Sequence, residues 1–273
     1  MLKQRVITAA VSLPLIIFAV WFGDPWFSLL IAAVALVGTS EFYHLIADSG
    51  KGCPLTYFGL LWALALVLSP HYKNISVSNV DILPLAITLP IVISLVWLLC
   101  RSPQEKAFHN WAWTIAGALY VGWMLSYWLG LRILEDGRNW VYLAMFTTFA
   151  NDTGAFFVGR AWGKHKLATA ISPGKTWEGA IGGLLSAIVG AIAISNIPVL
   201  FFPSPIKYWQ VILLGFLISL FAQVGDLVES LLKRNMGVKQ SGKLLPGHGG
   251  ILDRFDSLIF TGVVVYYYVV FAL

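Results

Sequence analysis

The sequence predicts an all-α fold: a polytopic helical membrane protein with about nine transmembrane helices. Of its 273 residues, 58% are hydrophobic and only 11% are charged, and the mean hydropathy is +0.78. An ordinary soluble domain carries about 25% charged residues. Several apolar stretches approach or exceed the roughly 18 to 20 residues that a helix needs to cross a bilayer core. The alternating pattern of an outer-membrane barrel is absent, so the helical class follows.

Hydropathy places nine candidate spans along the chain. They are residues 6–22, 26–47, 55–69, 80–100, 111–131, 139–159, 177–195, 208–229 and 257–272. The third and ninth spans are short, and the second carries Glu41 and His44 near its end. A re-entrant or tilted segment could therefore replace one crossing.

The basic residues predict a cytoplasmic N-terminus and an external C-terminus, because Lys and Arg concentrate in cytoplasmic loops. In this orientation all but four of the 18 Lys and Arg residues lie inside. The four exceptions are Lys73, Arg132, Arg138 and Lys207. The basic start of the chain is also typical of a signal peptide, but no small-residue cleavage site follows it, so we expect a retained first span.

The distribution of polar residues predicts two regions. Residues 1–135 have short loops and few polar side chains within their spans, so they are interpreted as an N-terminal transmembrane scaffold. Polar residues gather within residues 136–273, which we expect to form the C-terminal catalytic region. The net charge of +5 reflects the excess of cytoplasmic Lys and Arg and suits anionic substrates. In so apolar a protein it gives no reason to expect nucleic acid as a partner.

The end of the eighth span carries charges on one helical face. Asp226, Glu229, Ser230 and Lys233 follow at i, i+3, i+4 and i+7, and Arg234 adjoins them. A carboxylate at the end of a membrane helix is costly unless it is paired, hydrated or bound to a cation. In the alternative interpretation, these are interfacial charges whose long side chains extend to the membrane surface, and Glu229 and Lys233 form a helix pair. Asp226 lies deeper and favours a functional site.

The loop before the last span has a backbone suited to a tight turn that approaches a ligand. In PGHGG, residues 246–250, the glycines permit positive φ and close backbone approach. A helix that starts near Ile251 would direct its first N–H groups at this turn and favour a bound phosphate. Asp253 and Asp256 share one face of its first turn, although acids there also complement the helix dipole.

These acids and the surrounding cations predict a metal-assisted reaction of phosphates. Asp226, Asp253 and Asp256 offer hard oxygen ligands, whereas no His or Cys cluster has zinc spacing. Nearby Lys and Arg side chains suit a polyphosphate, so the sequence favours Mg²⁺ and phosphoryl or nucleotidyl transfer.

A third polar stretch covers residues 149–183. Asn151 and Asp152 lie inside a predicted span, where we expect the acid to have a partner such as a basic residue of the following loop. The GKT at 174–176 is no P-loop, because Thr169 stands where that motif needs glycine. Ser172 is expected to cap a helix from Pro173, and the small residues at 179–183 predict close helix packing.

The segment SLLKRNMGVKQSGKLLPGHGGILDRFDS, residues 230–257, resembles the signature of the phosphatidate cytidylyltransferases, also called CDP-diacylglycerol synthases. The matching positions are Ser230, Lys233, Arg234, Lys239, Pro246, His248, Gly249, Gly250, Asp253, Arg254 and Asp256. NDTGAFFVGRAWGKHKL and ISPGKTWEGAIGG are also similar to the bacterial members. The resemblance is strong over residues 139–273. One position departs, because Gln240 stands where the family has Asp.

The resemblance implies that CTP and phosphatidic acid form CDP-diacylglycerol and pyrophosphate, with Mg²⁺, in phospholipid biosynthesis. The metal ligands implied are Asp226 and Asp253. The catalytic residues implied are Asp226, Asp253, Asp256, Lys233 and Arg234. The substrate-binding residues implied are Ser230, Lys239, His248, Gly249, Gly250, Arg254, Asn151, Asp152 and Lys175. The site would face the cytoplasm from the inner (plasma) membrane.

The lipid bilayer is the expected surrounding, and the sequence leaves a homodimer open. Two other functions stay open from the residues alone. A CTP-dependent lipid or polyprenol kinase would use the same classes of residue, and an ion-coupled transporter would also explain intramembrane acids.

Overall fold

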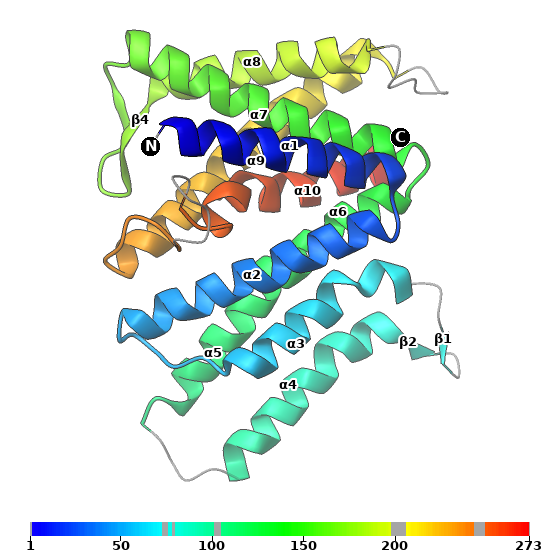
Figure 1. Cartoon of the computed structure of the whole chain (residues 1–273), viewed down its shortest axis with the longest axis vertical. Coiled ribbons are helices and arrows are strands. Elements are labelled where there is room, and N and C mark those ends of the chain that lie inside the picture. The colour runs from blue at the N-terminus through cyan, green and yellow to red at the C-terminus, as the bar shows by residue number, and fades with distance from the viewer. Residues whose placement is uncertain are drawn as a thin grey trace. The chain divides into compact units, whose positions relative to one another are not determined.

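We describe the fold from a computed structural model (Figure 1). The structure describes residues 2–72, 76–77, 80–100, 105–197, 206–242 and 249–272. Of the predicted site residues, His248 lies outside these ranges. The helices are α1 (Leu2–Phe22), α2 (Trp26–Asp48), α3 (Thr56–Val67), η1 (Ser69–Tyr72), α4 (Ile82–Cys100), α5 (Ala107–Gly117), η2 (Ala118–Trp123), α6 (Met124–Ile133), α7 (Gly137–Trp162), α8 (Trp177–Ser195), α9 (Tyr208–Asn235) and α10 (Leu252–Ala272).

The predicted all-α membrane class is confirmed. Helix occupies most of each of the nine predicted spans, with α5, the π-helical turn η2 and α6 forming one continuous rod. Within the described residues, six helices are long and apolar enough to cross a membrane. They are α2, α4, the Ala107–Ile133 rod, α8, α9 and α10. Shorter apolar helices occupy Ala10–Phe22 and Thr56–Val67.

Two short antiparallel hairpins interrupt the helices. β1 (Ser76–Val77) pairs with β2 (Val80–Asp81), and β3 (Lys166–Ala168) pairs with β4 (Ser172–Thr176). The expected helix cap at Ser172 is therefore wrong, because that residue begins a strand. Thr176 caps α8 instead, and its Oγ1 accepts a hydrogen bond from the N–H of Gly179 at 3.1 Å.

The chain divides into two compact units. Unit 1 contains Met1–Gly130 and Gln240–Asp253, and unit 2 contains Leu131–Lys239 and Arg254–Leu273. The segment Gln240–Asp253, which carries part of the family signature, groups with the N-terminal helices.

Unit 1 is organised around one tyrosine of α2. The Tyr43 hydroxyl donates a hydrogen bond to the carbonyl of Thr114 at 2.6 Å. A side chain at Gly59 of α3 or Gly117 of α5 would collide with the Tyr43 ring. Gly122 lets the η2 turn approach α3, because a Cβ there would lie 2.6 Å from the Cα of Ala63. The Tyr43 ring of α2 therefore packs tightly against glycines of α3 and α5.

Unit 2 is a close-packed set of helices. A Cβ at Gly182 of α8 would collide with the side chain of Val158 on α7, which confirms the close packing predicted for residues 179–183. A Cβ at Gly215 of α9 would lie 2.9 Å from the Cα of Ile188. A Cβ at Gly225 would lie 2.5 Å from the carbonyl oxygen of Asp256. Small residues therefore bring the helix backbones of this unit into near contact.

Candidate functional site

The acid at the centre of the predicted site, Asp226, is held by a lysine and a serine. Its Oδ2 lies 2.9 Å from the Nζ of Lys175, and its Oδ1 accepts a hydrogen bond from Ser230 Oγ at 3.2 Å. The side chains of Asp226 and Lys175 are 38% and 22% exposed. The structure therefore brings together three predicted site residues that come from a hairpin and from α9.

Contacts at both ends of the β3–β4 hairpin position Lys175. His165 Nδ1 lies 2.6 Å from Glu178 Oε1 in the first turn of α8. Arg234 donates from Nε to the carbonyl of Ile171 at 3.1 Å, which joins the hairpin turn to the end of α9. Because the hairpin is fastened to both helices, the Lys175 ammonium is directed at the acid rather than left to sample solvent.

One turn beyond Asp226, the helix pair that the alternative interpretation expected is present. Lys233 forms an ion pair with Glu229, whose residue is fully buried, while the Lys233 side chain is 13% exposed. Removing one member of a buried pair leaves an uncompensated charge, which is strongly destabilising. This contact gives Lys233 a structural role, and its predicted role toward phosphate stays a prediction.

Further acids gather around Asp226 within unit 2. Asp256 interacts electrostatically with Asp226, Glu229 and Asp152. Asp152 also lies within the electrostatic reach of Lys175 and Arg254. The basic partner expected for Asp152 is thus in place, although the direct ion pair of Lys175 is with Asp226.

Asn151 orients the Asp152 carboxylate of this acidic group. Asn151 is 1% exposed, and its Oδ1 accepts hydrogen bonds from Ser219 Oγ at 2.7 Å and Gln223 Nε2 at 3.3 Å. Its amide donates to Asp152 Oδ1 at 2.9 Å. The side chain predicted to bind substrate is therefore engaged in fixing the neighbouring carboxylate.

In unit 1, the loop before α10 closes on Asp253. The Oδ2 atom of Asp253 accepts hydrogen bonds from the N–H groups of Gly250 and Ser241, each at 2.9 Å, and from Ser241 Oγ at 3.0 Å. Gly249 has a φ of 86°, and a Cβ there would lie 2.7 Å from Asp253 Oδ2. The predicted positive φ is confirmed at Gly249, and the group that its backbone approaches is this carboxylate.

Glu41 is a further acid near Asp253, and no sequence motif assigns it to the site. This acid of α2 is 9% exposed and accepts hydrogen bonds from the N–H groups of Ile251 and Leu252, each at 2.9 Å. A lone acid within a predicted span needs a partner, and that requirement was the signal. Its partners lie about 210 positions away, so no local pattern reveals them.

The remaining predicted residues are distributed between the units. Lys239 and Arg254 are exposed in unit 2, and Gly250 is buried in unit 1. Among the residues that the structure describes, no three His, Cys, Asp or Glu side chains form a group that could hold a metal ion. Mg²⁺ is commonly held by one or two carboxylates together with substrate phosphates, so a smaller carboxylate set still suits it.

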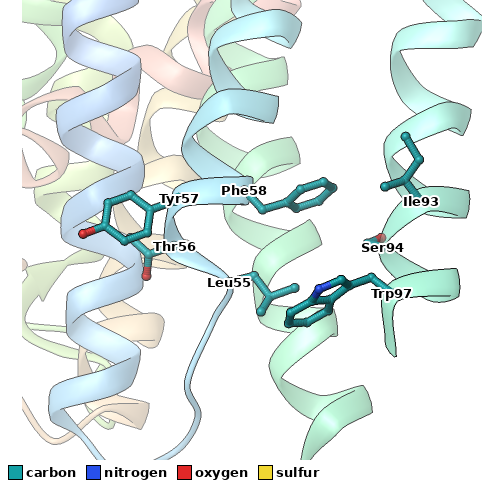
Figure 2. Close-up of a pocket in the computed structure, with 7 residues that line it drawn as sticks. All are labelled: Leu55, Thr56, Tyr57, Phe58, Ile93, Ser94 and Trp97. Atoms are coloured by element: carbon teal, nitrogen blue, oxygen red, sulfur yellow. The ribbon is translucent and has the colours of Figure 1, made fainter. Parts of the chain in front are cut away.

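A separate cavity of about 390 Å³ lies in unit 1 (Figure 2). Figure 2 shows side chains of α4 facing residues at the start of α3. The lining residues are Leu55, Thr56, Tyr57, Phe58, Ile93, Ser94 and Trp97. None of them is a predicted site residue, and the mostly apolar lining offers no charged group for a phosphate.

Comparison with known proteins places this sequence in a family. Residues 3–272 match the Cytidylyltransferase family. A phosphatidate cytidylyltransferase of Staphylococcus haemolyticus is 34% identical over 95% of both chains. One of Bacillus subtilis is 33% identical over 97% of both chains. Phosphatidate cytidylyltransferase 4, chloroplastic, of Arabidopsis thaliana is 34% identical over 98% of this chain and 73% of its own length. The chain therefore belongs to the Cytidylyltransferase family.

Proposed function

We propose that this protein is a phosphatidate cytidylyltransferase that converts CTP and phosphatidic acid into CDP-diacylglycerol and pyrophosphate. The near-full-length similarity to proteins with that name carries the proposal. The geometry agrees with it, because Lys175 and Arg254 lie near the acids of unit 2. Phosphoryl and nucleotidyl transfer need basic side chains for the phosphates and acids that hold a metal cation.

In the proposed reaction, a phosphate oxygen of phosphatidic acid attacks the α-phosphorus of CTP. A new P–O bond forms, the bond from the α-phosphorus to the oxygen bridging to the β-phosphate breaks, and pyrophosphate leaves with that electron pair. The attacking phosphate is already ionised near neutral pH, so no strong general base is needed. Catalysis then depends on positioning and on the stabilisation of charge.

The basic residues would neutralise the two anions. Lys175 is the side chain best placed for this role, because it is already held beside Asp226 by the hairpin. An arriving phosphate would compete with the carboxylate for the ammonium and draw Lys175 toward substrate. Arg234, Lys239 and Arg254 are assigned to the same task from the sequence signature.

We also propose Mg²⁺ as the cofactor, with Asp226 and Asp253 as its ligands. A lysine ammonium sits on Asp226, which indicates that this partly exposed carboxylate accepts a cation. The surrounding Asp152 and Asp256 are further oxygen donors of the hard type that Mg²⁺ prefers. The two ligands belong to different units, so their sharing of one ion is proposed from the sequence pattern. When bound, Mg²⁺ would supply electrostatic stabilisation of the phosphates.

The membrane arrangement is part of the proposal. Nine crossings with the N-terminus in the cytoplasm would put the β3–β4 hairpin and the signature loop on the cytoplasmic side, where CTP is available. Phosphatidic acid would reach the site laterally from the inner leaflet of the plasma membrane. A homodimer is compatible with this arrangement.

Purified protein tests the function directly. We expect pyrophosphate release that requires CTP, phosphatidic acid and Mg²⁺ together. With CTP labelled in the cytidine, the label should appear in the lipid, since a lipid kinase would leave only phosphate there. Failure to release pyrophosphate under these conditions would overturn the proposal.

A further inference from the structure

A buried acid of α2 makes contacts that neither the family signature nor the membrane setting explains. Glu41 lies within an apolar helix, where an unpaired carboxylate is costly. Among the described residues, the structure gives it no Lys or Arg as an ion-pair partner. Its negative charge is balanced instead by backbone N–H groups at the start of α10, where the helix dipole is favourable.

The contacts of Glu41 are directed at the turn that carries Asp253. One carboxylate oxygen accepts from the N–H of Ile251 and the other from the N–H of Leu252, both at 2.9 Å. These are the two residues that immediately precede Asp253. Glu41 therefore fixes the backbone from which that acid projects.

Ser241 connects the two carboxylates. Its Oγ lies 3.3 Å from Glu41 Oε2 and 3.0 Å from Asp253 Oδ2. A hydroxyl has a single proton, so it donates to one acid or is shared between both. Glu41 and Asp253 therefore share or compete for the Ser241 proton.

The surrounding glycines are shaped to this acid. A Cβ at Gly242 would lie 2.6 Å from Glu41 Oε1, and a Cβ at Gly250 would collide with the same carboxylate and with Ser241 Oγ. The backbone on both sides of the segment 243–248 therefore closes directly around Glu41. Such close approach requires residues without a side chain.

We propose that Glu41 is a positioning residue for Asp253 and that it sets the cation requirement of the reaction through Ser241 and the turn at Gly250–Leu252. The inference rests on the proposed function. Residues that support a metal-binding carboxylate typically change metal affinity or activity by about 10- to 100-fold when they are substituted. Glu41 should have an effect of this size.

The Glu41→Gln variant tests the proposal, because an amide offers one acceptor oxygen and turns an NH₂ group toward the second backbone N–H. We expect cytidylyl transfer to fall by about 10-fold or more and the Mg²⁺ concentration for half-maximal rate to rise. Hydrogen exchange should accelerate at residues 249–253 and stay unchanged in α7 and α8. Glu41→Asp, which keeps both oxygens on a shorter stem, should recover part of the activity.

Asp48→Asn is the matched control, since this exposed acid lies at the end of the same helix. It should behave as the wild type. Ser241→Ala should shift the Mg²⁺ requirement in the same direction as Glu41→Gln by a smaller factor, and it keeps the proposal testable if that variant does not fold.

The outcomes separate the two proposals. A wild type that makes no CDP-diacylglycerol overturns the proposed function and, with it, this inference. An active wild type whose Glu41→Gln variant keeps the same rate and Mg²⁺ dependence overturns the inference alone. Faster exchange throughout the protein with an unchanged Mg²⁺ requirement would make Glu41 a purely structural residue, which also contradicts it.

Discussion

At the scale of single residues, the site is defined by carboxylates whose partners are already in place. Asp226 contacts Lys175 and Ser230, and Asp253 contacts Ser241 and the N–H of Gly250. Ordering a side chain before substrate arrives lowers the entropy that binding must overcome. Both acids are thus oriented by contacts within their own unit.

The ion pair at Asp226 predicts a loss of activity in Lys175→Met. The substitution removes the cation that the hairpin delivers to the site, and loss of one such electrostatic contact typically costs about 100-fold or more in kcat. Lys166→Met is the control, because that lysine is exposed on the same hairpin. Steady-state rates of pyrophosphate release would measure both variants, and equal rates would contradict the assigned role.

Neutralising the acids is expected to stop the reaction without unfolding the protein. Asp226→Asn and Asp253→Asn keep the size and an acceptor oxygen but lose the charge that a cation requires, so turnover should fall by at least about 100-fold. Asp136→Asn is the control, because Asn tolerates the left-handed φ of 55° found there. Thermal unfolding in detergent should be similar for all three, and near-normal turnover in either site variant would remove that acid from the metal site.

At the scale of elements, glycines set how closely the helices of unit 2 approach one another. α7 and α8 meet through small residues, and α7 carries Asn151 and Asp152 on the same packed helix. Transmembrane helices lack a hydrophobic driving force for association, so close packing and interhelical hydrogen bonds hold them together. The position of the Asp152 carboxylate therefore depends on the α7–α8 contact.

The substitution Gly182→Ala tests this contact. Its new Cβ would collide with Val158, and overpacking of this kind costs about 1 to 3 kcal/mol. A lower thermal unfolding midpoint and reduced turnover are the expected results. Gly174→Ala adds the same methyl group where nothing lies within 4 Å, so it should leave both unchanged. Equal unfolding midpoints for the two variants would show that the helices can separate at little cost.

At the scale of the whole molecule, the charge pattern of the loops predicts sidedness. The basic hairpin of unit 2 is expected to face the cytoplasm, and Lys207 at the start of α9 is expected to lie outside. Both described cysteines, Cys53 and Cys100, are exposed thiols that must be replaced before labelling.

Single cysteines in a cysteine-free background would measure this topology. A membrane-impermeant thiol reagent applied to intact cells should label Lys207→Cys and spare Lys164→Cys, because only the former is predicted to lie outside. Inverted vesicles should give the reverse pattern. Labelling of both positions from one side would rule out the proposed orientation.

The sequence by itself determined the membrane class, the positions of the helical segments and the local pairs. Hydropathy depends on composition within one segment, so the nine predicted spans coincide with helices. The pair of Glu229 and Lys233 follows from helical spacing alone. The small residues at 179–183 predicted the close packing of α8, which is against α7. Family membership likewise rests on the sequence alone, which matches the family over residues 3–272.

Only the tertiary structure decided which distant groups meet. The sequence allowed Lys175 to pair with Asp152, yet the β3–β4 hairpin places its ammonium in an ion pair with Asp226. Glu41 reaches Ser241, Ile251 and Leu252 across most of the chain, and its distant partners left no periodic signal. Such contacts depend on how loops close and helices cross, which are long-range properties that neither hydropathy nor local spacing encodes.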